Sequence, residues 1–418
     1  MKQVNLLTDS PRRLFFHYLG PTIGSSMVTS IYILADTIMV GQGVGDAGLA
    51  ALTIFMPIVA SFFALGLLLG VGGGVLMSVA KGSGNESLAH KYFSTAMISA
   101  AVVSVCFAVF GAIFFDPMMY ALGADTTNIE LVRGYGLCYT VSAPLFIFSS
   151  SLQSFIRNDK SPRHAMIAVL TGSGLNILLD YLFIFVFKMG MFGASFATSI
   201  GTSITVCILV IHFFTKKNTM RFSFRFFSIK ALWEIAKCGF SSFLIECANA
   251  VLVFVFNHTL LKYIGSVGVT VYSIMSNVAV VCMSLFNGVT LAAQPIIATN
   301  HGADNHKRVL QVRHIGTITS SVIAVIIFCV GFFFPDLLIY SYVKGPTPEI
   351  LDLARYALRI YFFAYLFMNF NIFFSGYFQS TLRPVAAITI QILRSLLLSS
   401  VLVSVLPMIF GADAIWYA

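Results

Sequence analysis

The sequence predicts an all-α polytopic membrane protein built from two parallel halves. Hydrophobic residues make up 58% of the 418-residue chain, and charged residues make up 10%, against roughly 25% in a soluble domain. The mean hydropathy is +0.90, so the bilayer must act as the solvent for most of the surface. Motifs of the first half also recur in the second half at a nearly constant offset.

Apolar stretches divide the chain into the predicted spans, in order. Each one exceeds the roughly 20 residues that a helix needs to cross the hydrocarbon core. Eleven are visible, and a twelfth begins at Ala412; they lie at 14–40, 51–80, 93–115, 130–156, 164–187, 191–214, 237–262, 268–298, 310–334, 350–380 and 385–409. Strands of a barrel would be about 10 residues long, so helices are favoured. We expect the first stretch to stay in the protein, because it is too long for a signal peptide.

The internal repeat gives the domain organisation. Lys81-Gly82-Ser83-Gly84-Asn85 is matched 220 positions later by His301-Gly302-Ala303-Asp304-Asn305, and Pro162 is matched by Pro384. Two parallel copies in an apolar chain indicate a transporter with its pathway between them. We predict a tail at 1–13, an N-lobe at 14–216, a linker at 217–236 and a C-lobe at 237–418. By the repeat offset, the last helix is truncated in this chain.

The basic residues predict the orientation. Most of the 25 lysines and arginines fall before the first span, in alternate loops and in the linker. The positive-inside rule therefore places the N-terminus in the cytoplasm. The net charge of +9 reflects this bias and does not indicate nucleic-acid binding. The linker mixes basic and aromatic residues, which favours a segment along the membrane interface, with a solvated linker as the alternative.

Two aspartates in predicted spans are candidates for an ion site, because ionisable groups are costly inside a bilayer. Asp180 lies well inside the fifth span, with Asn176 one turn away on the same face and Thr198 at similar depth on the returning helix. These side chains can form an oxygen-lined pocket for a proton or Na⁺; the alternative is a hydrogen-bond cluster that only joins helices. Asp36 lies near the outer boundary of the first span, where contact with water is the alternative.

Two further ionisable residues fall near the middle of predicted spans. Glu246 and Arg394 lie at similar depth in the second half. In the structural interpretation they pair with each other; in the functional one, Glu246 binds a proton, an ion or a cationic substrate. The seven cysteines follow no metal or disulfide spacing. We find no nucleophile–base pair and no cofactor motif, so an enzyme is disfavoured.

Four motifs, taken together, resemble the multidrug and toxic compound extrusion (MATE) family, in its bacterial MepA-type branch. The similarity runs from about Leu14 to Ala418. The motifs are Ala35-Asp36-Thr37-Ile38-Met39-Val40-Gly41, Phe155-Ile156-Arg157-Asn158-Asp159-Lys160-Ser161-Pro162, Asn176-Ile177-Leu178-Leu179-Asp180-Tyr181-Leu182-Phe183-Ile184-Phe185 and Gln294-Pro295-Ile296-Ile297-Ala298-Thr299-Asn300-His301-Gly302-Ala303.

This resemblance implies twelve helices in two six-helix lobes, related by a pseudo-two-fold axis along the membrane normal. It implies export of small amphipathic or cationic drug-like compounds by alternating access and antiport with H⁺ or Na⁺, without a cofactor or another metal. The implied ion-coupling residues are Asp36, Asn176, Asp180 and Thr198, with Tyr135 nearby. Pro21 matches a hinge in the first helix. Glu246 matches an acidic position of another branch, whose second acid is replaced here by Asn369 and Asn371.

The setting implied by the same resemblance is the cytoplasmic (inner or plasma) membrane of a bacterium. We expect a monomer whose partners are its substrates and the lipid bilayer, and no nucleic acid. The alternative function is a flippase or exporter of lipid-linked saccharide precursors with a related two-lobed architecture. A cavity lined by several cations would favour that alternative.

Overall fold

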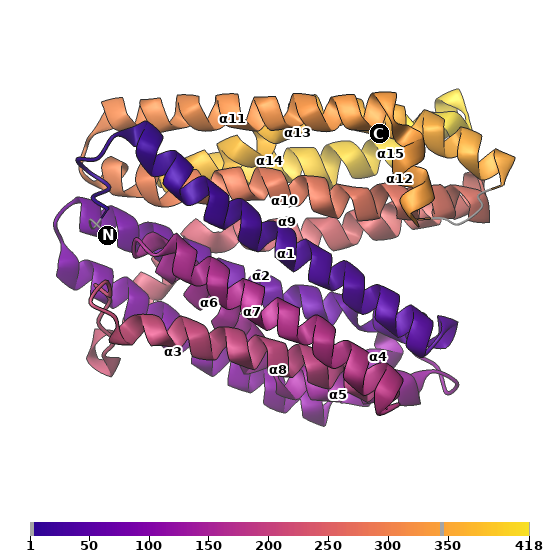
Figure 1. Cartoon of the computed structure of the whole chain (residues 1–418), viewed down its shortest axis with the longest axis horizontal. Helices are drawn as coiled ribbons and strands as arrows, with labels where there is room; N and C mark the ends of the chain where they lie inside the picture. Colours follow the sequence, from indigo (N-terminus) through magenta and orange to yellow (C-terminus); the bar gives the residue numbers. More distant parts are fainter. Residues whose placement is uncertain (1–3, 343–346, 418) are drawn as a thin grey trace.

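The chain forms a bundle of long helices (Figure 1). The computed structural model describes residues 4–342 and 347–417, so residues 1–3 of the predicted tail and Ala418 lie outside the described part. Within that part there is no strand. Ten helices are long and apolar enough to cross a membrane, and one bent helix pair raises the total to 11. The eleven predicted spans and the all-α fold class are confirmed.

The first half of the chain contains the helices up to the linker. They are α1 (Pro11–Gly43), α2 (Asp46–Gly82), α3 (Glu86–Ile113), α4 (Phe115–Ala121), α5 (Ile129–Val141), α6 (Ala143–Asn158), α7 (Pro162–Asp180), the π-helix η1 (Tyr181–Val186), α8 (Gly190–Ile211) and the 3₁₀-helices η2 (His212–Phe214) and η3 (Phe224–Phe226).

The second half follows the same order of long and short helices. They are α9 (Ile229–Tyr263), α10 (Ser266–Gly302), α11 (His306–Phe333), α12 (Pro335–Tyr342), α13 (Pro348–Ser380), α14 (Pro384–Gln391), the π-helix η4 (Ile392–Leu398), α15 (Ser399–Phe410) and the 3₁₀-helix η5 (Ala412–Tyr417). The predicted start of a twelfth helix at Ala412 therefore coincides with η5.

Two boundaries differ from the sequence prediction. The stretch 130–156 is not one straight span but the pair α5 and α6, bent by 52°. Pro144 lies in the first turn of α6, where proline is tolerated because its missing N–H has no intrahelical partner. The seventh span begins at Ile229 rather than near 237, because the Ser228 side chain accepts a hydrogen bond from the Ala231 N–H and starts α9 inside the predicted linker.

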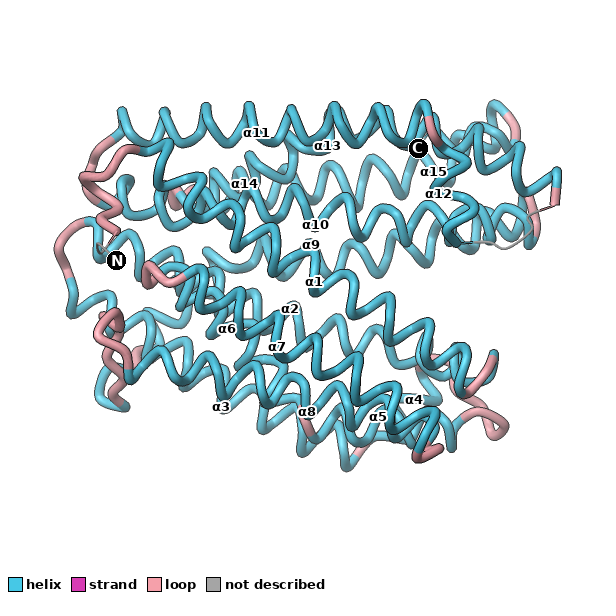
Figure 2. Tube along the Cα trace, in the orientation of Figure 1, coloured by secondary structure: helices cyan, strands magenta, loops and turns pink. Residues whose placement is uncertain are grey.

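The two halves form separate bodies that meet along four helices. In Figures 1 and 2, α2–α8 lie below and α10–α15 above, and α1 runs diagonally from the upper group at the end marked N to the lower group at the other end. The two groups lie close together at the end marked N, here called the closed end, and spread apart at the other end. Helix α2 packs along α9, and α1 packs along α10. Each half also has an apolar cluster of its own, which includes Phe55 and Phe62 in the first half and Phe286 and Tyr365 in the second.

At the closed end, two glycines bring the backbones of α2 and α10 into contact. A methyl group on Gly82 would lie 2.0 Å from the carbonyl oxygen of Thr299, and one on Gly302 would lie 2.0 Å from that of Val79. Thr299 and Gly302 are the repeat counterparts of Val79 and Gly82. The contact is therefore symmetric, and any side chain larger than hydrogen would separate the helices.

The linker between the halves is bound to the first half. Thr219 hydrogen-bonds to Asp159, and the Ser94 hydroxyl donates to the carbonyl of Arg221. Phe224 and Trp233 are exposed, at 76% and 63%. Exposed aromatic rings beside basic residues are consistent with the predicted position along the membrane interface, which stays a prediction.

Candidate ion-coupling site and central cavity

The predicted ion-site residues come together inside the first half. Asp36, on α1, is 7% exposed, and Asp180, at the C-terminal end of α7, is fully buried. On the neighbouring helices, the Asn176 side-chain amide donates a hydrogen bond of 3.2 Å to the Thr198 hydroxyl. The Asp36 and Asp180 carboxylates lie close enough to interact electrostatically. The burial of Asp36 argues against its alternative placement in contact with water.

The oxygens of this cluster are left without ordinary partners. Among the described residues, neither carboxylate oxygen of Asp180 has a hydrogen bond of good geometry, nor have Oδ1 of Asp36 and Oδ1 of Asn176. Buried polar atoms are normally paired, and an unpaired one costs free energy. Several buried, unpaired oxygens facing one region suit a proton or a small hard cation such as Na⁺. Among the described residues, no group of three or more His, Cys, Asp or Glu side chains is placed to hold a metal ion.

The backbone at Asp180 is irregular. Helix α7 ends at this residue, and the chain continues as the π-helix η1, without a loop. π-Helical turns are rare and occur often at functional sites. A change of helical period directly after Asp180 alters which side chains face α1 on either side of it. No sequence pattern indicates this change, because the apolar run 177–187 continues unbroken except for Asp180.

Tyrosines complete the wall of the cluster. Tyr135, on α5, is 2% exposed and interacts electrostatically with both aspartates. Tyr32, on α1, also interacts electrostatically with both aspartates, although it was not among the predicted site residues. The sequence could have indicated Tyr32, because it precedes Asp36 by one helical turn and so lies on the same face of the helix.

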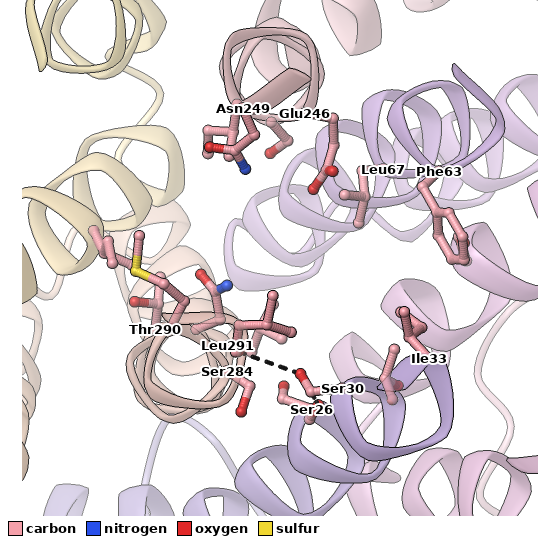
Figure 3. Close-up of a pocket in the computed structure, with 18 of the residues that line it drawn as sticks. Ser26, Ser30, Ile33, Phe63, Leu67, Glu246, Asn249, Ser284, Thr290 and Leu291 are labelled. Atoms are coloured by element: carbon pink, nitrogen blue, oxygen red, sulfur yellow. Dashed lines mark hydrogen bonds between the residues drawn. The ribbon is translucent and has the colours of Figure 1, made fainter. Parts of the chain in front are cut away.

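A cavity of about 680 Å³ lies between the two halves. This volume falls in the range of small-molecule sites, which is roughly 300–1,000 Å³. Figure 3 shows Glu246 and Asn249 on α9, across the cavity from Ser26 and Ser30 on α1. Hydroxyl and amide groups are frequent among the lining residues, next to apolar ones. The lining therefore mixes hydroxyl and amide groups with apolar side chains.

The cavity extends to the ion cluster and carries few charges. Asn176 and Thr198 line it, so the aspartate pair lies directly behind its wall. The charged lining residues are Arg157, Glu246 and Arg394. The predicted pairing of Glu246 with Arg394 is not among the ion pairs of the described residues. Pro21 is buried within α1, which continues through it without a break, so its role as a hinge stays a prediction.

A second polar cluster, which the sequence did not predict, is buried at the closed end. The Asp159 side chain is 0% exposed and pairs with Lys81 and, at 2.8 Å, with His212. Burial raises the pKa of Asp159, but His212, Lys81 and Thr219 outweigh that effect and lower its pKa below the ordinary value. The carboxylate therefore stays ionised. Next to this cluster, Arg157 is also buried, at 7%.

Comparisons with known proteins agree over nearly the whole chain. The model of the MatE family matches residues 21–182 and 238–405. The multidrug export protein MepA of Staphylococcus haemolyticus is 26% identical over 97% of this chain and 89% of its own length. MepA of Staphylococcus saprophyticus is 26% identical over 96% of this chain and 88% of its length.

Solved structures share the fold. A crystal structure of MATE in complex with MaL6 superposes with a TM-score of 0.94 over 100% of this chain and 94% of the other, at 22% identity. An outward-facing multidrug resistance MATE transporter superposes with a TM-score of 0.93, over 100% of this chain and 93% of the other. At this identity the likeness establishes the arrangement of the helices and nothing about the substrate.

Proposed function

This chain belongs to the MatE family, and we propose that it exports amphipathic and cationic compounds by antiport with H⁺ or Na⁺. Its relatives are multidrug export proteins, so it is a multi-pass membrane transporter rather than an enzyme, and it needs no cofactor. These relatives do not favour the flippase alternative. The charged residues that line the cavity are two arginines and Glu246. This set differs from the cluster of cations that would favour a flippase.

The observation that carries this proposal is the position of the ion cluster behind the cavity wall. Asn176 and Thr198 belong to both sites, because they line the cavity and lie beside Asp180. A proton or Na⁺ at Asp36 and Asp180 would supply the partners that their oxygens lack. Loading would change the packing of α1 against α7, which contact each other along their length. Because linkage is reciprocal, bound substrate must then weaken ion binding to the same degree.

The driving force is sufficient for concentrative export. One unit of pH gradient supplies about 1.4 kcal/mol per proton, and 100 mV of membrane potential supplies about 2.3 kcal/mol per charge moved. In this proposal Pro21 lets α1 bend, and the lobes at 14–216 and 237–418 alternate in exposing the cavity. The transporter works as a monomer in the plasma membrane, with its N-terminus and the linker 217–236 in the cytoplasm.

Transport in proteoliposomes tests this function. The purified protein is reconstituted, a fluorescent amphipathic cation is added, and pH and Na⁺ gradients are imposed separately. We expect uphill movement of the dye with one of the two gradients, and none in liposomes without protein. Movement that responds to neither gradient would contradict antiport.

A further inference from the structure

Arg157 is a buried cation in the wall of the central cavity. It lies in the last turn of α6, is 7% exposed and lines the cavity. One of its five N–H donors reaches the Ser154 hydroxyl at 3.0 Å. Among the described residues, no ion pair includes Arg157. The nearby carboxylate of Asp159 already binds Lys81, His212 and Thr219.

A buried charge without a counter-charge is costly, because an ion moved out of water loses its hydration. Such groups are normally paired. Here the missing partner can come only from the cavity side, because the carboxylate next along the chain is occupied by other groups. The planar guanidinium presents a fork of donors that matches a carboxylate in two parallel hydrogen bonds.

The second half of the molecule shows that this position does not need an arginine. Arg157 lies five residues before Pro162, and Gln379 lies five residues before Pro384, so they are counterparts in the repeat. Gln379 also lines the cavity, but its amide donates to the carbonyl of Cys238 at 2.9 Å and to the hydroxyl of Ser242 at 3.0 Å. The side-chain amide of Gln379 therefore finds its hydrogen-bond partners within its own lobe, whereas the guanidinium of Arg157 has no counter-charge there.

We propose that Arg157 forms an anion subsite of the cavity, which binds the carboxylate of substrates that carry a carboxylate in addition to a cationic group. This inference rests on the proposed function, because it assigns a substrate class to the same cavity. Glu246, on α9 in the second half, places an acidic side chain on the same space. Compounds with both charges gain two opposite contacts there, whereas a compound with only a positive charge leaves Arg157 unpaired.

Binding of two matched dyes tests the subsite. The probes are a rhodamine with a free carboxylate and the methyl ester of the same dye, measured by fluorescence anisotropy with the purified protein in a neutral detergent. We expect the wild type to prefer the free acid. Arg157→Gln should lower the ratio of the two affinities about tenfold, which corresponds to about 1.4 kcal/mol. Arg157→Lys keeps the charge without the fork and should lower the ratio less.

The controls separate the possible failures. Arg163→Gln removes an exposed arginine near the same end and should leave the ratio at the wild-type value. If Arg157→Gln weakens both dyes equally, Arg157 has a structural role and the proposal is wrong. If adding phosphatidylglycerol abolishes the preference for the free acid, a lipid phosphate occupies the subsite and the substrate assignment is wrong. Failure of the wild type to bind or transport even the ester would instead contradict the proposed function.

Discussion

The two halves share their structural contacts and differ in their buried charges. Arg133 pairs with Asp116 in the first half, and Arg355 pairs with Asp336 at the same place in the second. The helices that follow Gly82 and Gly302 are both capped by an asparagine side chain. Among the described residues, by contrast, a buried aspartate pair occurs in the first half alone. The repeat counterpart of Asp36 is Phe256, at the offset of 220.

This difference separates what builds the fold from what couples transport. Contacts that hold a six-helix lobe together are needed twice, so duplication keeps them in both copies. A coupling ion needs one site, and a second buried acid pair would carry the same desolvation cost without a partner. Positions at which the repeat is broken are therefore the best candidates for function. In this molecule they include Asp36, Asp180 and Arg157.

The largest expected effect comes from removing the charge that only the first half carries. Asp180→Asn keeps the shape of the side chain but cannot exchange a proton or pair with Na⁺. We expect gradient-driven export to fall to the level measured without a gradient, while the protein stays folded in the membrane. Asp36→Asn should behave alike, and the double variant should be little worse than either, because the two groups act as one site.

The matched control is a carboxylate that both halves share. Asp336→Asn removes the same chemical group from the salt bridge with Arg355, far from the cavity lining, and should retain coupled export. Efflux from vesicles with equal amounts of each variant measures both effects. Coupled export by Asp180→Asn at the wild-type rate would remove this site from the mechanism.

Asp159 tests whether the buried cluster at the closed end is a stability element. Its repeat counterpart is Thr381, so the second half lacks the carboxylate. Asp159→Asn removes the ionised partner of Lys81, which is 17% exposed, and of the buried His212, and we expect a loss of about 3 kcal/mol in the free energy of unfolding. Because the native pKa of Asp159 is lowered, its contribution is present above the ordinary pKa near 3.8 and is lost as pH falls through the native value.

Thermal unfolding in detergent between neutral and acidic pH measures this contribution. The wild type should lose stability toward low pH more steeply than Asp159→Asn, so the two curves converge in acid. Thr381→Ala in the second half serves as the control and should leave the pH dependence unchanged. Parallel curves for wild type and Asp159→Asn would show that the cluster contributes nothing through its charge.

Replacing the glycine on either side of the α2–α10 contact at the closed end should separate the two helices by a similar amount. Gly82→Val and Gly302→Val each place a side chain against a backbone carbonyl, which costs about 1–3 kcal/mol when the helices cannot move apart. We expect both variants to increase the separation between α2 and α10, measured between spin labels at Ser83 and Ala303. Gly20→Ala, where an added methyl group meets nothing within 4 Å, should leave this separation unchanged. A response to only one of the two valines would show that the contact is not symmetric in function.

Much of this architecture was predictable from the sequence, because a bilayer converts apolar length directly into spans. The aspartate cluster was predictable as well, since Asp36 and Asp180 interrupt long apolar runs. The burial of Arg157 and Asp159 was not predictable, because a charged residue near the end of a span is typical of a cytoplasmic loop. Asp159 is buried against Lys81, His212 and Thr219, which are distant from it along the chain. Contacts between such distant segments leave no periodic pattern. The bend between α5 and α6 was hidden for a related reason, since one proline in an apolar run does not specify an angle.

The smallest expected effect concerns the contact that the two halves share most closely. The Arg133–Asp116 and Arg355–Asp336 pairs are partly exposed in both cases, with side-chain exposures of 38% and 41%, and 36% and 45%. Exposed ion pairs contribute little, because water and salt screen them. Asp116→Asn and Asp336→Asn should therefore lower the melting temperature in detergent slightly and by similar amounts, and high salt should remove the difference from wild type. A large effect of one substitution only would show that the contact holds just one lobe together, and that likeness of position in the repeat does not imply likeness of energetic role.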